Sequence, residues 1–136
     1  MHDTINGAMF KEMLLFGTVS IAQAQQAIND LNVFPVPDGD TGTNMSLTIQ
    51  TAAQELKKIE PATVDQAASV TASALLRGAR GNSGVITSQI LRGVAEGLVS
   101  ADEPITSANI AFAFRRAVKV AFQAVRKPIE GTILTV

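Results

Sequence analysis

The spacing of apolar residues limits the fold of this chain more than any other feature of the sequence. Apolar side chains recur every three or four positions, the period of one face of an α-helix. No stretch of useful length alternates apolar and polar residues as a half-buried strand would. The sequence therefore predicts an all-α fold. The expected helices cover about residues 5–31, a segment that starts within 41–45 and ends in the pair Lys57-Lys58, then 63–77, a segment through 86–98 and 106–126, with another starting at Thr132.

Composition indicates one domain with an aliphatic core. The 136 residues are 46% hydrophobic but only 4% aromatic, so alanine and aliphatic side chains must fill the interior. Met13 and Phe16 continue the apolar row of the first helix, and we expect them in the core. A net charge of -1 gives no basic footprint for nucleic acid, and there is no cysteine for disulfides or thiolate sites. With no signal peptide and no apolar run of the ~20 residues that span a membrane, we expect a soluble, cytoplasmic protein.

The segment Asn32–Met45 has the composition of a binding loop. Pro35 and Pro37 stiffen the chain before Asp38, and Asp40 follows two residues later. In an extended segment these two carboxylates would project to the same side and converge on one point. Two carboxylates on a short loop suit Mg²⁺, which commonly completes its shell with water and substrate phosphates. A solvated Pro-Asp-Gly turn is the plain alternative.

The same loop leads into a helix whose start could hold an anion. Thr41, Thr43 or Asn44 can cap this helix, and its free backbone N–H groups would face a phosphate beside the metal. Better-known motifs do not fit the sequence. A calcium-binding EF-hand loop beginning at Asp38 would need Gly and Glu at the positions of Thr43 and Ile49. No P-loop and no Gly-x-Gly-x-x-Gly motif occurs in the sequence.

A second glycine-rich loop opens another helix. In Gly78–Gln89, three glycines surround Arg80, Asn82 and Ser83 before the apolar row resumes. Asn82 and Ser83 could bind phosphate oxygens together with the backbone N–H groups, and Arg80 could add a cation. An ordinary turn between helices, capped by one of these residues, is the alternative.

These loops resemble those of a known enzyme family. Asn32–Met45, Gly78–Gln89 and Pro128–Thr132 are similar to the N-terminal kinase domain of bacterial fatty acid kinases, which belongs with the ATP-binding subunits or domains of dihydroxyacetone kinases. The resemblance covers essentially the whole chain. It implies an antiparallel helical barrel or bundle with ATP-binding loops at one end, two Mg²⁺ ions, and a single domain over residues 1–136 that is truncated at its C-terminal side.

The resemblance also implies a role for individual residues. Asp38 and Asp40 would be metal ligands, and Asn32 stands near the place of a third aspartate of the dihydroxyacetone kinases. The nucleotide would be held by Thr41, Gly42, Thr43, Asn44, Arg80, Gly81, Asn82, Ser83, Gly84 and Thr132.

The implied reaction transfers the γ-phosphate of ATP to the carboxylate of a fatty acid held by a separate fatty-acid-binding protein, giving an acyl phosphate. A carboxylate is already ionised at neutral pH, so we expect no catalytic general base. Three alternatives stay open: a dihydroxyacetone-type kinase subunit, a non-catalytic nucleotide-binding regulatory module, and a purely structural helical module. A homodimer of the full-length protein also stays open.

Overall fold

Five helices make up the structure, a computed structural model that describes residues 4–33, 37–99, 105–125 and 133. They are α1 (Gly7–Leu31), α2 (Thr41–Leu56), α3 (Val64–Gly78), α4 (Gly81–Val99) and α5 (Ser107–Ala124). The all-α prediction is confirmed, and within these ranges the only β-type pairing is an isolated bridge between Ile5 and Ile105. The helix expected at Thr132 falls outside the described residues.

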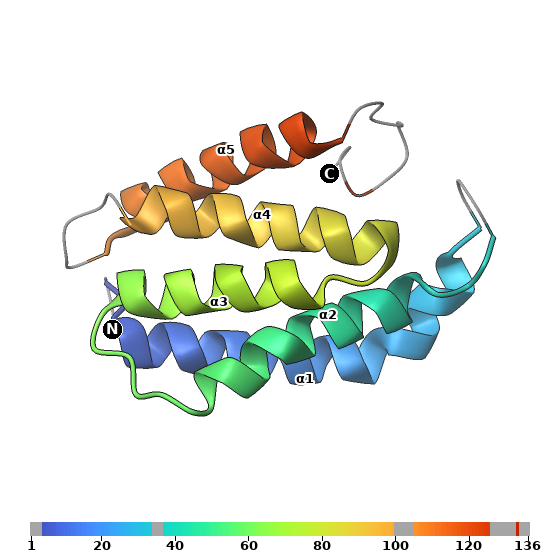
Figure 1. The fold of residues 1–136 in the computed structure, drawn as a ribbon, viewed down its shortest axis with the longest axis horizontal. Coiled ribbons are helices and arrows are strands. Elements are labelled where there is room, and N and C mark those ends of the chain that lie inside the picture. Colours follow the sequence, from blue (N-terminus) through green and yellow to red (C-terminus); the bar gives the residue numbers. More distant parts are fainter. Residues whose placement is uncertain (1–3, 34–36, 100–104, 126–132, 134–136) are drawn as a thin grey trace.

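Successive helices run in opposite directions and form a bundle (Figure 1). In it, α2 contacts α1, α3 and α4, while α4 contacts α3 and α5. The first and fifth helices lie at opposite edges of the bundle in this view. The connections that precede α2 and α4 lie toward the same end (Figure 1). An antiparallel helical bundle is thus confirmed, and its closure into a barrel stays a prediction.

Local capping signals set several helix starts. The side chain of Thr63 accepts a hydrogen bond from the N–H of Gln66 at 3.1 Å and starts α3. Thr106 and Asn109 form a reciprocal capping box at the start of α5. Both predicted starts are therefore confirmed, because each hydroxyl satisfies an N–H that the first helical turn leaves without an internal partner.

The core is aliphatic and rich in alanine, as the composition predicted. Its largest fully buried apolar side chains are Leu56, Leu75, Ile105 and Val64. Close contact between α4 and α5 depends on two glycines: an added Cβ would lie 2.4 Å from the Ala117 Cα at Gly93 and 2.7 Å from the Ala113 Cα at Gly97. Gly93 and Gly97 therefore allow the backbones of the two helices to approach closely.

The predicted burial of the first helix is wrong at Met13, which is 57% exposed, and at Phe16, which is 76% exposed. Leu31 at the end of the helix is 79% exposed as well. The fifth helix likewise exposes Val118, at 57%. The reason is position: α1 and α5 lie at the edges of the bundle, so neighbouring helices cover only part of their circumference. None of the described helices is long and apolar enough to cross a membrane.

Candidate functional site at the starts of α2 and α4

Two asparagines at the end of α1 cap the start of α2. The Asn32 Oδ1 accepts hydrogen bonds from the N–H groups of Asp40 at 3.0 Å and Thr41 at 3.1 Å. One turn earlier in α1, the Asn29 Oδ1 accepts from the Thr43 N–H at 3.0 Å. Asp40 is the formal N-cap but makes no side-chain capping bond. The start of α2 is therefore fastened to the preceding helix by side chains.

This capping corrects the expectation that α2 offers free backbone N–H groups to an anion. The N–H groups of Thr41 and Thr43 are already used by α1. Within the described ranges, only the Gly42 N–H of these first three helical residues has no side-chain acceptor. An anion at this terminus would meet mainly the dipole and side chains.

The Thr43 side chain belongs to the same contact between the end of α1 and the start of α2. Its hydroxyl oxygen accepts from the Asn29 Nδ2 at 2.9 Å and from the Gln25 Nε2 at 3.1 Å. A hydroxyl has two acceptor positions and one proton, so the proton of Thr43 remains available for another acceptor.

The two predicted metal ligands lie at a bend in the chain. Asp38 and Asp40 are both exposed, and Gly39 between them has a φ of 67°. The extended-chain reason for expecting their carboxylates to converge is therefore wrong, because the backbone turns at the glycine. Their convergence stays a prediction. The described residues include no group of three or more acidic, histidine or cysteine side chains that could hold a metal, so Mg²⁺ here would depend on water and phosphate for its other ligands.

Asn32 has a structural task that competes with metal binding. An amide oxygen has two acceptor positions, and the N–H groups of Asp40 and Thr41 occupy both on the Asn32 side chain. To bind a metal through this oxygen, Asn32 would have to release one of them.

The start of α4 is built differently. Gly81 begins the helix with a φ of 65°, a conformation that side chains disfavour. The Gly84 N–H makes the first helical bond, to the Arg80 carbonyl oxygen at 3.1 Å. In the part of the chain that the structure describes, no side chain accepts from the N–H groups of Gly81, Asn82 or Ser83. This terminus keeps the features that suit an anion.

The structure brings the two helix starts together. The Ser83 hydroxyl reaches the Thr41 carbonyl oxygen at 3.5 Å, a long hydrogen bond. A Cβ added to Gly81 would lie 2.4 Å from the Asn44 Nδ2, so the second loop rests directly on the first turns of α2. The residues predicted from two separate motifs therefore form one region, apart from Thr132, which lies outside the described residues.

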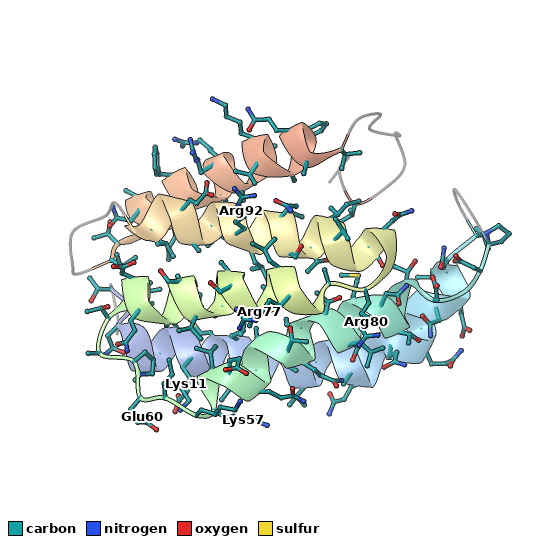
Figure 2. The ribbon with its side chains drawn as sticks, viewed as in Figure 1. Lys11, Lys57, Glu60, Arg77, Arg80 and Arg92 are labelled. Atoms are coloured by element: carbon teal, nitrogen blue, oxygen red, sulfur yellow. The ribbon has the colours of Figure 1, made fainter. Side chains whose placement is uncertain are left out.

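One residue of this region escaped the sequence analysis. Thr48 is completely buried in α2; its hydroxyl accepts from the Arg80 N–H at 3.0 Å and donates to the Asn44 carbonyl oxygen at 2.7 Å. Asn44, Thr48 and Thr51 repeat at helical spacing opposite the glycines of the second loop. This row of polar side chains on one face of α2 is the sequence feature that could have identified Thr48. The side chain of Arg80 itself is exposed (Figure 2).

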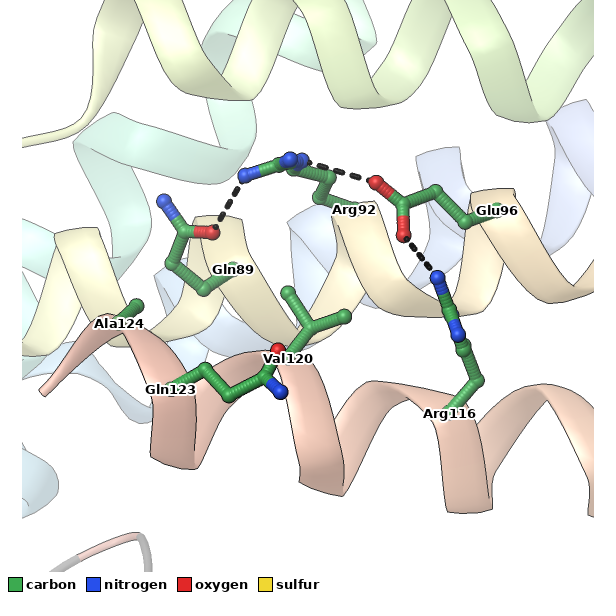
Figure 3. A pocket seen from close by; sticks show the side chains of 7 residues that line it. All are labelled: Gln89, Arg92, Glu96, Arg116, Val120, Gln123 and Ala124. Carbon is green, nitrogen blue, oxygen red and sulfur yellow. Dashed lines mark hydrogen bonds and ion pairs between the residues drawn. The ribbon is translucent and has the colours of Figure 1, made fainter.

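A hollow of about 310 Å³ lies elsewhere, between α4 and α5 (Figure 3). Within it, Glu96 pairs with Arg92 at 3.1 Å and with Arg116 at 3.5 Å, and Arg92 also bonds Gln89 at 3.2 Å. None of the predicted nucleotide-binding residues lines it. Since these charged side chains pair with each other, they link α4 to α5, and the hollow is not a second candidate site.

Comparison with known proteins identifies the family. The DAK2 domain matches residues 35–136, which include the second loop and the first loop from Pro35 onward. This chain belongs to the DAK2 domain family. The DAK2 domain is part of the dihydroxyacetone kinase family, so the predicted kinase relationship is confirmed at that level.

The relatives of this DAK2 domain are longer proteins. The chain is 45% identical over 133 residues to protein YloV of Bacillus subtilis, covering 98% of the chain and 24% of YloV. Uncharacterized proteins of Staphylococcus haemolyticus and Staphylococcus aureus are 42% and 43% identical over 136 residues, the whole of this chain and 24% and 25% of theirs. The chain thus spans about a quarter of the length of the curated relatives it matches.

Proposed function

We propose that this DAK2 domain binds Mg·ATP across the starts of α2 and α4. In its full-length protein it would transfer the γ-phosphate to the carboxylate of a fatty acid held by a separate fatty-acid-binding protein, giving an acyl phosphate. The observation that carries the proposal is the contact between the two loops, which joins a helix start that no described side chain caps to a loop with two exposed carboxylates. One part suits phosphate and the other suits a divalent cation.

The residues divide this task by their chemistry. Asp38 and Asp40 would hold Mg²⁺, while the N–H groups at the start of α4, with Asn82 and Ser83, would hold phosphate oxygens. The exposed guanidinium of Arg80 would add a positive charge at the same edge. Bound Mg²⁺ would neutralise charge on the β- and γ-phosphates during transfer.

The choice of a fatty acid carboxylate as the phosphate acceptor rests on the resemblance of the loops to those of bacterial fatty acid kinases. A carboxylate acceptor is ionised at neutral pH and needs no general base. Dihydroxyacetone is the second candidate acceptor, favoured by the family to which the DAK2 domain belongs. A hydroxyl acceptor must lose its proton, which makes the two chemically distinguishable.

The first experiment is a calorimetric titration with a non-hydrolysable ATP analogue, with and without Mg²⁺. We expect magnesium-dependent binding that Asp38→Asn/Asp40→Asn weakens by about tenfold or more, because each lost charge-assisted contact contributes about 1.5–3 kcal/mol. The matched control is Glu12→Gln/Asp65→Asn, which removes the same charge from exposed positions near the starts of α1 and α3.

Equal binding by the two double variants would contradict the metal assignment. Absence of binding by the folded chain, and by the longer protein if the gene encodes one, would contradict the nucleotide proposal. If Mg·ATP binds, formation of acyl phosphate in the presence of a fatty-acid-loaded carrier, and not of dihydroxyacetone phosphate, would support the fatty acid acceptor. The opposite result would assign the second candidate.

A further inference from the structure

A buried hydroxyl group forms hydrogen bonds to both helix starts. Thr48 has no exposed surface, and its oxygen accepts the Arg80 N–H at 3.0 Å while its proton goes to the Asn44 carbonyl oxygen at 2.7 Å. Both of these partners belong to the candidate site: Arg80 precedes α4, and Asn44 lies in the first turn of α2. Thr48 therefore lies beneath the site and bonds to both of its halves.

The surroundings leave this side chain little freedom. A Cβ added to Gly84 would lie 2.3 Å from the Thr48 Oγ1, so α4 presses directly on the hydroxyl. The link before α4 consists of Ala79 and Arg80 alone, between the last residue of α3 and the first of α4. A bond to the Arg80 N–H thus fixes half of that link. Without it, the backbone that positions the first N–H groups of α4, which no described side chain caps, would be held less firmly.

We propose that Thr48 is a positioning residue that sets the distance and orientation of the α4 start relative to the loop of Asp38 and Asp40. This inference rests on the proposed function, since it concerns how the same site grips the phosphates of Mg·ATP. Thr48 itself does not touch the nucleotide; it acts through the Arg80 backbone. Because the two halves must act on one ligand, a small displacement between them weakens binding more than it weakens the fold.

The test compares three variants by titration with the Mg²⁺-loaded ATP analogue. Thr48→Val keeps the shape of the side chain but removes the acceptor for the Arg80 N–H, and we expect it to weaken binding by about tenfold. Thr48→Ser keeps the hydroxyl and should restore affinity to within about twofold of the original protein. The control is Thr71→Val, which alters a threonine that is 2% exposed in α3 and whose hydroxyl bonds only its own helix, at the Ala67 carbonyl oxygen.

Amide hydrogen exchange provides a readout that does not depend on the ligand. The Arg80 N–H should exchange slowly in the unmodified chain and in Thr71→Val, and quickly in Thr48→Val, because only the last loses its acceptor. If Thr48→Val does not fold, Thr48→Ala takes its place. Tight binding by the hydroxyl-free variant, or equal losses in the Thr48 and Thr71 variants, would overturn the inference alone. Absence of binding by the unmodified chain, and by the longer protein if the gene encodes one, would overturn it together with the proposed function.

Discussion

The starts of α2 and α4 carry similar sequence signals but are built in opposite ways. Each has a glycine within its first residues and several Asn, Ser or Thr side chains nearby. At α2, Asn29 and Asn32 from the preceding helix accept backbone N–H groups. At α4, no side chain of the described ranges does so. The first is a contact within the fold, whereas the second leaves its first backbone N–H groups without a side-chain acceptor among the described residues.

The difference follows from what precedes each helix. Before α2 the chain leaves α1 through a longer loop and returns beside it, so the last turns of α1 lie within reach of the new helix. Before α4 only two residues separate it from α3, and the residue directly before the helix is Arg80, whose guanidinium has no acceptor for a backbone N–H. Its backbone is held from the side instead, by Thr48.

We expect the largest loss of stability from a substitution at Gly42, where α2 contacts α1. In Gly42→Ala the new Cβ would lie 2.3 Å from the Gln25 backbone oxygen, which cannot rotate away as a side chain could. We expect a loss of about 3 kcal/mol in the free energy of unfolding, measured by urea denaturation. The control is Gly17→Ala, within α1 with nothing inside 4 Å of the new Cβ, which should gain about 0.5–1 kcal/mol. Similar stability of the two variants would mean that α1 and α2 are not in close contact here.

A smaller effect separates the asparagines at the two helix starts. Asn29→Ala removes the acceptor for the Thr43 N–H and should destabilise the protein by about 1 kcal/mol, as other capping losses do. Asn82→Ala removes an exposed side chain that caps nothing in the described part of the chain, and should change stability by less than about 0.5 kcal/mol. Thermal or urea unfolding of the two variants, side by side, measures the contrast. The reverse ranking would show that α4, not α2, is held by its asparagine.

Much of the fold could be predicted because helices leave a local record in sequence. Apolar spacing located all five described helices, and Thr63 and Thr106 marked two starts correctly. Burial was less predictable, as Phe16 shows: the periodic pattern identifies an apolar face but not whether a neighbouring helix covers it. An edge helix and a central helix can have the same pattern.

The site divides in the same way between local and non-local features. Glycines and polar residues before a helical pattern identified both loops, because that signal is contained within a few residues. The caps supplied by Asn29 and Asn32 were not predicted, since they depend on how the end of α1 lies against α2. Thr48 was missed for the same reason: its partner on the second loop lies 32 residues away in the sequence.

Substitution of Ser83 should change stability least, and it is the sharpest test of the difference between the starts of α2 and α4. The Ser83 hydroxyl makes a single 3.5 Å hydrogen bond to the Thr41 carbonyl oxygen, too long to contribute much. Ser83→Ala should therefore alter the free energy of unfolding by less than about 0.5 kcal/mol. If the α4 start binds phosphate, the same variant should weaken the Mg·ATP analogue by about three- to tenfold, because the lost bond is made to a charged oxygen. Ser69→Ala, an exposed serine on α3 with a 3.4 Å bond to Asp65, is the matched control and should change neither quantity. A large loss of stability without loss of affinity in Ser83→Ala would make the α4 start a structural contact like that of α2.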